Sequence, residues 1–556
     1  MYNGFKRTRA HASVVNFWRQ KMAKYKFNTF GVMLDMSRNS VMNLPSLKDF
    51  MRLIKKMGYN CVFLYTEDTY EIDEPYFGYL RGRYSKAEMK EIDEFASSIG
   101  IEVIPCIQTL AHLKTYLRWC KVPGDCDDIL LTDDSKTYEL IDKMLASLSE
   151  CFKTRRIHIG MDEAHMLGRG RHLDIHGYES SISVIKRHLT RVIELTKKYG
   201  YTPMLWSDMF FRSWNNGKYT IPKQTLPAEV IDAFNKEVIP VYWDYYNNNK
   251  QAYSDMMYNH SQLSDKTWFA GGVWGWGGLV PFNELSINNM IPAIDACREH
   301  KVKDVFITLW GDDGGECSHF AEIPGLYSII EHAKGNTDEK KSREKFKRIF
   351  GLDYEDFLAI DIPNQLTEEK KIANPSKYML YSDPFAGFLD YTVTFGMGQK
   401  YADYAKKLSE ISKKSRKFGY IFKTEALLCS VLEIKYELGA KTREAYQSGN
   451  KEALATLLGD YTETVRRIKA FYKALAYAWH RDYKPNGFEV QQIRIGGLMQ
   501  RIEGCRERLN MYIKGEIDKI EELEEEILPV YRNSIKGEPV YFNHVPKASS
   551  VNVTYF

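Results

Sequence analysis

Two adjacent carboxylates, Asp162 and Glu163, are the residues of this chain best suited to do chemistry. They follow a short apolar run at residues 157–161, which predicts a buried strand. Parallel α/β folds place their active sites at the C-terminal ends of such strands. Two neighbouring carboxylates repel each other, so one tends to stay protonated while the other ionises. That division suits an acid working beside a charged stabiliser, whereas the alternative is a plain acidic corner between strand and loop.

Three kinds of chemistry could use these carboxylates. Residues 162–165 spell a helicase box, but no phosphate-binding Gly-x-x-x-x-Gly-Lys-Ser/Thr motif accompanies it. A metal site could use His158, Asp162 and His165, yet the sequence has no His-Glu-x-x-His and His158 fits a buried, hydrogen-bonded position better. We therefore expect no metal and no cofactor. Glycoside hydrolysis fits best, because it needs an acid for the leaving oxygen and a negative group for an oxocarbenium-like state.

Eight strand-like runs in the first 315 residues predict the scaffold that positions these groups. Helix-like amphipathic stretches separate most of them, for example residues 47–56, 86–99, 138–150, 181–198 and 287–299. Strands that alternate with helices indicate βαβ units and a parallel sheet, and eight such units predict an α/β fold of the (β/α)₈ TIM-barrel type. The runs are residues 29–35, 61–67, 103–109, 157–161, 203–208, 238–244, 268–274 and 305–310.

Polar and aromatic residues gather where nearly every predicted strand ends. In a (β/α)₈ barrel those ends meet at one mouth, so we expect one shared pocket. A single tryptophan is more often core than ligand platform, but the recurrence at strand ends favours a sugar site, because flat apolar faces stack on sugar rings. The residues are Arg38, Glu67, Asp68, Gln108, His112, Asp162, Glu163, Trp206, Asp208, Trp243, Tyr245, Trp274, Trp276, Trp310, Asp312 and Asp313.

A helical region follows the predicted barrel. Apolar residues recur at helical spacing in residues 401–418, 423–447, 451–479 and 490–527. We expect an N-terminal extension over residues 1–25, a catalytic barrel over 26–350 and a mainly helical domain over 351–556. The helical domain lacks a converging set of strand-end carboxylates, so we expect it to be structural or oligomeric, covering a barrel face or a partner subunit. Its final segment, from residue 534 onward, carries no predicted role.

The composition is that of a soluble globular protein, with 44% hydrophobic and 27% charged residues. A net charge of +4 is too small to predict a nucleic-acid or membrane partner. Nine scattered cysteines favour a reducing compartment, and the first residues contain no apolar core of a signal peptide. We therefore expect a cytoplasmic protein, and the sequence is compatible with a homodimer.

The run His158-Ile159-Gly160-Met161-Asp162-Glu163 resembles the His-x-Gly-x-Asp-Glu signature of family 20 β-N-acetylhexosaminidases. The resemblance continues in order at residues 65–68, 108–112, 206–208, 243–245 and 308–312, and it covers roughly residues 25–345. It is closest to the branch without signal peptides, the hexosaminidase D type and its bacterial relatives. It implies retaining hydrolysis in which the substrate's own 2-acetamido oxygen attacks the anomeric carbon and gives an oxazolinium intermediate.

The resemblance also implies roles for individual residues. Glu163 matches the general acid/base, and Asp162 matches the residue that holds the acetamido N–H and stabilises positive charge. Tyr245 matches a hydrogen-bond donor to the acetamido oxygen. The residues implied to bind the sugar are Glu67, Asp68, His112, Trp206, Trp243, Trp274, Trp310 and Asp312.

The sequence departs from the family at one position. Many members carry an arginine just before the glycine of the first strand, which grips O3 and O4 of the sugar. Here Phe30 precedes Gly31, and Arg38 matches a different, more structural arginine. We therefore expect an exo-acting enzyme with weak discrimination at O4, which releases terminal β-GlcNAc and β-GalNAc from oligosaccharides or glycoconjugates. Two alternatives stay open: a non-catalytic sugar-binding barrel, and a retaining glycosidase with Asp312 or Glu316 as nucleophile.

Overall fold

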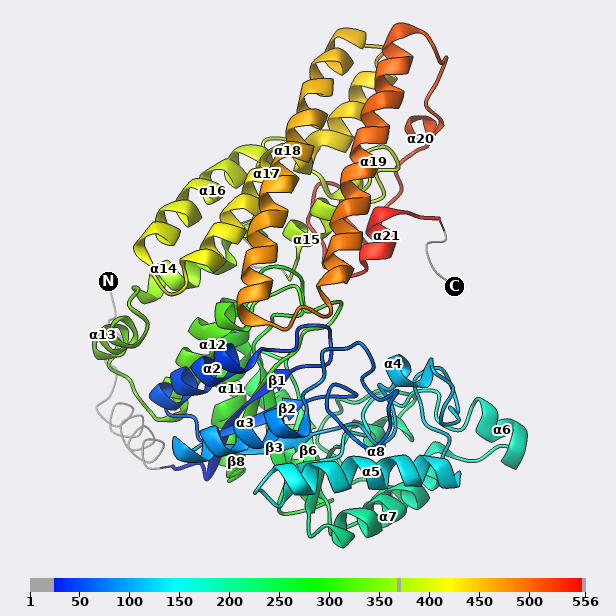
Figure 1. Cartoon of the computed structure of the whole chain (residues 1–556), viewed down its shortest axis with the longest axis vertical. Coiled ribbons are helices and arrows are strands. Elements are labelled where there is room, and N and C mark those ends of the chain that lie inside the picture. Colours follow the sequence, from blue (N-terminus) through cyan, green and yellow to red (C-terminus); the bar gives the residue numbers. More distant parts are fainter. Residues whose placement is uncertain (1–24, 368–371, 553–556) are drawn as a thin grey trace, which may run out of the picture.

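Eight parallel strands close into a barrel in the computed structural model, which describes residues 25–367 and 372–552 (Figure 1). Strand β1 pairs with β2 on one side and with β8 on the other, so Gly31 lies opposite both Cys61 and Phe306. This closure confirms the predicted (β/α)₈ barrel, while the predicted N-terminal extension lies, except for residue 25, outside the described residues. The strands are β1 (Thr29–Asp35), β2 (Cys61–Tyr65), β3 (Glu102–Cys106), β4 (Arg156–His158), β5 (Thr202–Trp206), β6 (Ile239–Trp243), β7 (Trp268–Gly272) and β8 (Asp304–Leu309).

Helices connect the strands around the outside of the barrel, and local signals in the sequence fix their ends. The Asn43 side chain caps the start of α2, and Gly58 ends that helix in a left-handed conformation. A capping box between Ser85 and Glu88 starts α3. The helices of this part are α2 (Leu44–Met57), α3 (Lys86–Ser98), α4 (Lys114–Leu117), α5 (Ser135–Cys151), α6 (Arg171–His176), α7 (Ser181–Lys198), α8 (Asp208–Arg212), α9 (Ala228–Ala233), α10 (Lys250–Ser261), α11 (Asn283–Glu299) and α12 (Ile323–Ala333).

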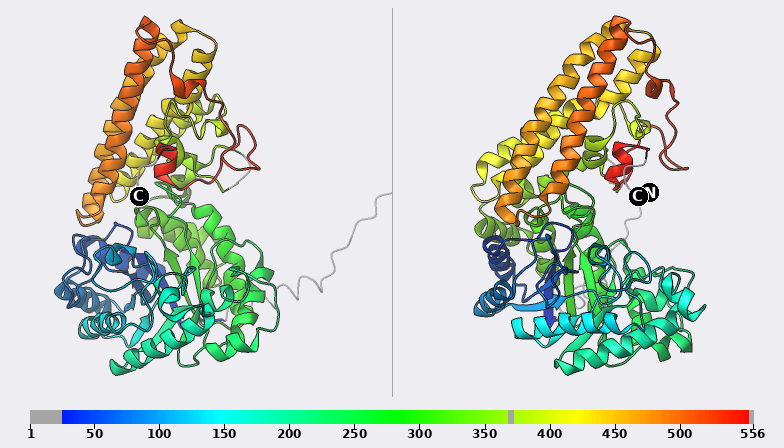
Figure 2. Two further views of the ribbon diagram at one scale, coloured as in Figure 1. Left: turned by 90° about the vertical axis from the view of Figure 1, so that its right-hand side faces the viewer. Right: turned by 45° about the vertical axis from the view of Figure 1, so that its right-hand side comes forward.

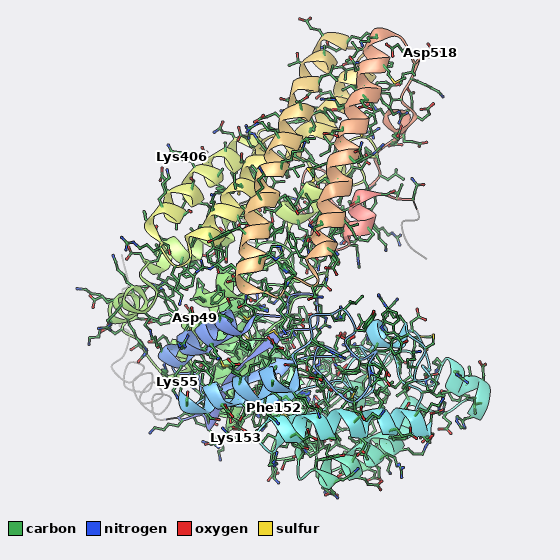
Figure 3. All side chains as sticks on the ribbon, viewed as in Figure 1. Asp49, Lys55, Phe152, Lys153, Lys406 and Asp518 are labelled. Carbon is green, nitrogen blue, oxygen red and sulfur yellow. The ribbon has the colours of Figure 1, made fainter. Side chains whose placement is uncertain are left out.

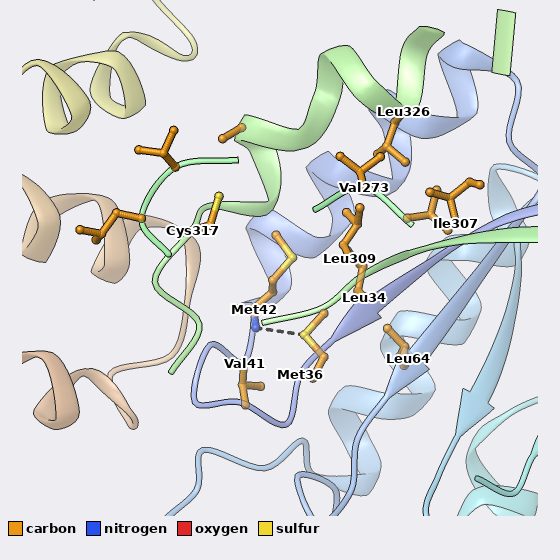
Figure 4. Close-up of a cluster of buried hydrophobic side chains, with 14 of the residues drawn as sticks. Leu34, Met36, Val41, Met42, Leu64, Val273, Ile307, Leu309, Cys317 and Leu326 are labelled. Atoms are coloured by element: carbon orange, nitrogen blue, oxygen red, sulfur yellow. Dashed lines mark hydrogen bonds between the residues drawn. The ribbon is translucent and has the colours of Figure 1, made fainter. Parts of the chain in front are cut away.

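Side chains of the strands alternate between the barrel interior and the surrounding helices. The rings of Phe63 and Phe306 stack inside the barrel with centroids 4.2 Å apart, and Trp206 belongs to the same inner cluster. Leu34 belongs to the outer cluster, which Figure 4 shows together with Leu326 of α12. Because the interior is filled with large side chains, a pocket at the mouth has a closed floor.

The second part of the chain is helical, as predicted, except at its end. The last long helix was expected to reach residue 527, but α19 ends at Lys514, because Gly515 adopts a left-handed conformation and caps it. The helices are α13 (Glu339–Phe350), α14 (Tyr354–Leu358), α15 (Pro375–Tyr381), α16 (Met397–Lys414), α17 (Gly419–Gln447), α18 (Lys451–Asp482), α19 (Phe488–Lys514), α20 (Glu521–Glu524) and α21 (Val545–Ser549).

The helical region stands on the C-terminal mouth of the barrel (Figures 1 and 2). The turn between α18 and α19 meets the loops after β1 and β2: the Lys484 N–H donates to Val41 O, and the Asn486 side chain donates to Leu80 O. On α19, Arg494 bonds Asp313 in the loop after β8. The helical region therefore covers part of the mouth, which fits the expectation that it packs on a barrel face.

Charged side chains lie on the outer surfaces of both parts. Lys55 and Lys153 are exposed on the barrel, and Lys406 and Asp518 are exposed on the helical region (Figure 3). Within the described ranges, no helix combines the length and the apolar character needed to cross a membrane. All nine cysteines lie in those ranges and carry free thiols.

Candidate active site

A small open pocket lies at the C-terminal mouth of the barrel, where the strand ends were predicted to converge. Eight of the eleven predicted site residues line it, together with three others. A larger cavity of about 610 Å³ lies between α11 and residues 361–367 and contains none of the predicted residues. The lining residues of the small pocket are Arg38, His112, Asp162, Glu163, Trp206, Trp243, Tyr245, Tyr246, Trp276, Trp310 and Asp312.

A tight turn after β4 brings both adjacent carboxylates to this pocket. The predicted strand was expected to continue to residue 161, but β4 ends at His158, and Gly160, Met161 and Glu163 all have left-handed backbone angles. A β-carbon on Gly160 would lie 2.1 Å from Gln108 Oε1, so only glycine fits there. Because the strand has ended, its alternation of side chains no longer separates neighbours, and Asp162 and Glu163 can face one cavity.

Asp162 is held as a carboxylate by two neighbours. Gln108 Nε2 donates to one carboxylate oxygen over 2.7 Å, and His112 Nε2 lies 3.2 Å from the other. Burial alone would raise the pKa of Asp162, but the adjacent His112 and the Gln108 hydrogen bond lower it to about 2. Burial alone would lower the pKa of His112, but Asp162 raises it to about 9. At neutral pH the two therefore form an ion pair.

Glu163 is the more open carboxylate of the pair, with 40% of its side chain exposed. Its main-chain N–H donates to Asp208 Oδ2 over 3.1 Å, and the same oxygen accepts from Arg212 Nε over 3.0 Å. Arg212 and His112 each lie 3.9 Å from the Glu163 carboxylate. Burial, followed by the negative charge of Asp162, raises the pKa of Asp208 to about 7. Glu163 is thus fixed through its backbone while its carboxyl group faces the open pocket.

Aromatic side chains form the walls. Trp206 is nearly fully buried and lies 6.0 Å from the ring of Trp310, and Trp243 stacks on Tyr245 at 5.4 Å. Trp310 Nε1 donates to the Tyr245 hydroxyl over 3.1 Å, so the proton of that hydroxyl is available to an acceptor in the pocket. Trp274 Nε1 donates to the main-chain oxygen of Tyr245, which anchors the tyrosine. Flat apolar walls beside a few fixed polar groups suit a pyranose ring.

Two family models match the chain at the two parts that the structure separates. The glycosyl hydrolase family 20 catalytic domain matches residues 11–259, and the glycoside hydrolase 20C C-terminal domain matches residues 355–540. The chain belongs to glycoside hydrolase family 20.

This family 20 chain is similar to two curated relatives. Hexosaminidase D of Homo sapiens is 27% identical over 212 residues, which cover 36% of this chain and 41% of the relative. Hexosaminidase D of Bos taurus is 24% identical over 266 residues, which cover 45% and 70% of the two chains. The chain thus spans less than half the length of the human relative that it matches.

Two solved structures are similar at lower identity. An exo-β-N-acetylglucosaminidase of Vibrio harveyi, in complex with N-acetylglucosamine, is 15% identical with a TM-score of 0.44, covering 60% of this chain and 59% of that chain. A β-hexosaminidase mutant of Streptomyces plicatus, in complex with GlcNAc, is 17% identical with a TM-score of 0.43, covering 59% and 69%.

Arg38 corrects one expectation for this family 20 chain, because it lines the pocket. Its guanidinium lies 3.1 Å from Asp35, 3.4 Å from Glu67 and 3.8 Å from Asp312, and it lies over the rings of Tyr65 and Trp310. The loop after β1 carries Arg38 to the mouth. The pocket therefore contains an arginine, although Phe30 stands at the position where many family members carry one.

Phe30 lies too far from the mouth to matter for sugar binding. It is buried near the start of β1, and its ring packs against Phe27 and Tyr59. Asp35, at the end of the strand, is five positions further along, a distance of roughly 16 Å at the usual rise per residue. A residue at this position cannot reach a ligand at the C-terminal end.

The structure places three predicted binding residues behind the pocket lining. Glu67 is buried and accepts from the Tyr65 hydroxyl, while it also pairs with Arg38. Asp68 is buried and bonds Arg81 and the Thr115 hydroxyl, so its carboxylate is already satisfied. Trp274 stacks against Trp276 at 4.8 Å, and it is Trp276 that lines the pocket. These three residues support the lining without being part of it.

Two further residues have fixed partners outside the pocket. Glu316, one of the two alternative nucleophiles, is buried and bonded by Lys377, Arg494 and the Tyr381 hydroxyl. Its carboxylate is therefore not available to a sugar in the pocket. Burial lowers the pKa of His158 to about 3, and its Nδ1 accepts from the Gly160 N–H, so His158 is a neutral, buried histidine as expected.

Arg38 and Trp276 were expected at the barrel mouth but were not predicted to bind the sugar, and Tyr246 was not predicted at all; all three line the pocket. The last two stood beside predicted residues, in the pairs Tyr245-Tyr246 and Trp274-Gly-Trp276, but nothing in a sequence tells which neighbour faces a cavity. Gln108 was noted only as a strand end. Its amide oxygen accepts a hydrogen bond from the Met161 N–H, and its amide nitrogen donates one to Asp162.

Proposed function

We propose that this protein is an exo-acting β-N-acetylhexosaminidase that removes terminal β-linked N-acetylhexosamine from glycans by substrate-assisted, retaining hydrolysis. The observation that carries the proposal is the pair of adjacent carboxylates in one pocket, one ionised against His112 and the other open to the cavity. This mechanism needs one carboxyl group that acts as the acid and a second, ionised one that stabilises positive charge, and different surroundings let two neighbouring carboxylates divide these roles.

In the first step, the acetamido oxygen of the substrate attacks the anomeric carbon and the glycosidic C–O bond breaks. Glu163 gives its proton to the leaving oxygen, and its open position at the mouth suits that role. Asp162 accepts the acetamido N–H and stabilises the positive charge of the oxazolinium ion. The Tyr245 hydroxyl, whose oxygen already accepts from Trp310, donates to the acetamido oxygen.

In the second step, water attacks the anomeric carbon from the face that the leaving group vacated. The Glu163 carboxylate takes one proton from this water, the oxazolinium ring opens and the sugar is released with its original configuration. The filled barrel interior under Trp206 limits the pocket to one terminal sugar, which makes the enzyme exo-acting. Arg38 and Asp312 both line the pocket, 3.8 Å apart, and are placed to bind ring hydroxyls.

Three nitrophenyl glycosides test the proposal. We expect turnover of the β-GlcNAc and β-GalNAc substrates and none of the β-glucoside, because the glucoside lacks the nucleophile. If the protein cleaves none of the three substrates but still binds a GlcNAc-derived thiazoline, the non-catalytic sugar-binding barrel is favoured. Rapid β-glucoside turnover, or a covalent sugar trapped on Asp312, would favour an enzyme nucleophile instead.

A further inference from the structure

A segment near the C-terminal end of the described chain returns to the barrel mouth. Asn543 Nδ2 donates to the main-chain oxygen of Trp276 over 2.9 Å, and Asn543 Oδ1 accepts from Lys377 Nζ over 2.6 Å. One residue earlier, the Phe542 N–H donates to the buried side chain of Asn374 over 2.7 Å. These bonds fix the backbone of residues 541–543 directly against the loop after β7.

This anchoring places Tyr541 at the edge of the sugar pocket. Its ring meets Trp274 edge to face at 6.2 Å, and it packs against the aromatic cluster that contains Trp276. Burial raises the pKa of the Tyr541 hydroxyl, and the negative charge of Asp312 raises it further. Tyr541 remains partly exposed.

The outer rim of the pocket is where a leaving group must lie. Glu163 protonates the leaving oxygen at the mouth, so the rest of the substrate extends outward from there. Tyr246 stands on this rim, with 55% of the residue exposed, and its ring packs edge to face on Trp274 at 5.3 Å. Tyr246 and Tyr541 therefore share one support, Trp274, and present two aromatic side chains beyond the terminal sugar.

We propose that Tyr541, supplied by the helical region, forms with Tyr246 the binding site for the sugar unit next to the cleaved bond. The occupant is a pyranose ring of an oligosaccharide, whose flat C–H face packs on an aromatic ring. This inference rests on the proposed hexosaminidase activity and adds to it a specificity residue from outside the barrel.

The test compares ligands that do and do not reach this site. Chitotriose places its second sugar unit next to the cleaved bond, in the proposed site. A GlcNAc-derived thiazoline fills only the terminal sugar site. For Tyr541→Ala we expect kcat/KM on chitotriose to fall about tenfold, roughly 1.4 kcal/mol. Thiazoline affinity should stay within about twofold of the wild type. Tyr541→Phe should behave as wild type, and Tyr541→Leu, which keeps apolar volume without an aromatic face, should resemble the alanine variant.

The outcomes separate this inference from the proposed activity. Tyr477→Ala, which removes an exposed tyrosine elsewhere in the helical region, is the matched control and should change neither measurement. If wild-type protein cleaves nothing, the proposed function fails. If wild type cleaves chitotriose and Tyr541→Leu cleaves it equally well, only the Tyr541 site is refuted. Equal losses in chitotriose turnover and thiazoline affinity would show a general structural role and would also refute it.

Discussion

The carboxylate of Asp208 accepts a hydrogen bond of 3.1 Å from the main-chain N–H of Glu163. Glu163 has a left-handed backbone (φ 51°), a conformation that costs a non-glycine residue about 1–3 kcal/mol unless its surroundings impose it. Asp208 is buried and also bonds Arg212, so it ties the strained residue to α8. The orientation of the proposed acid therefore depends on a residue that never touches the sugar.

Replacing Asp208 with alanine should lower kcat about tenfold or more while KM changes little, because Glu163 is positioned less well but sugar contacts remain. Asp208→Asn keeps an acceptor oxygen and should recover most of the rate. Steady-state kinetics on nitrophenyl β-GlcNAc would check this. A rise in KM at constant kcat in the alanine variant would contradict the positioning role.

Glu163→Gln should lower kcat by about 10²–10⁴-fold, the usual worth of general acid–base catalysis. The loss should be smaller for nitrophenyl substrates than for chitobiose, because a good leaving group needs less protonation. Kinetics on the two substrates in parallel measure this difference. Equal losses on both would argue against the acid role.

The His112–Asp162 ion pair should stabilise the folded protein at neutral pH and lose this effect at alkaline pH. The pKa of His112 is raised to about 9 in the folded protein, above an unfolded value of about 6.5. Its contribution is therefore fully present below about pH 6.5 and is lost as the pH rises through about 9. We expect the Tm difference between wild type and His112→Gln to shrink over this range. A difference that stays constant from pH 6 to 10 would contradict the ion pair.

Arg38→Ala should lower kcat/KM by about 10- to 150-fold, because a buried charge-assisted hydrogen bond contributes about 1.5–3 kcal/mol. Since Arg38 is present in the pocket, the earlier reason to expect tolerance at O4 no longer holds. Wild type should discriminate between the β-GlcNAc and β-GalNAc nitrophenyl substrates more strongly than Arg38→Ala does. An unchanged ratio would show that Arg38 does not contact O4.

Lys377→Ala should destabilise the protein strongly. Lys377 and Glu316 are almost fully buried and pair at 3.0 Å, and breaking such a pair costs about 3–5 kcal/mol. Lys441→Ala, which breaks a half-exposed pair with Glu437, is the control and should cost less than about 1 kcal/mol. Thermal unfolding of both variants should give a much larger Tm loss for Lys377→Ala. Similar Tm values would contradict the importance of this buried contact between the helical region and the loop after β8.

Much of the barrel could be predicted because each strand and helix carries its own periodic pattern. Predicted residues such as Asp162 and Trp310 meet in the pocket because parallel strands end at one mouth, a rule of topology rather than of side-chain detail. Which of two nearby residues faces the pocket, as with Trp274 and Trp276, depends on loop conformation and could not be predicted from the sequence.

Two other features required tertiary structure. Arg38 reaches the pocket only because its loop bends over the mouth, and motif comparison assigned it a structural place instead. Tyr541 follows Trp310 by more than two hundred residues, and no local pattern links the two. Contacts of this range arise from how the helical region docks on the barrel, which periodicity does not encode.

The return of residues 541–543 to the mouth has a consequence for how the protein is made. Ribosomes add about 5–20 residues per second, so roughly 10–50 s separate the synthesis of β8 from that of Tyr541. During this interval a nascent barrel can close while Trp274 and Trp276 still lack their contacts with residues 541–543. The growing chain thus exposes an aromatic surface that a segment made later packs against, and termination before that segment would leave this surface open to aggregation.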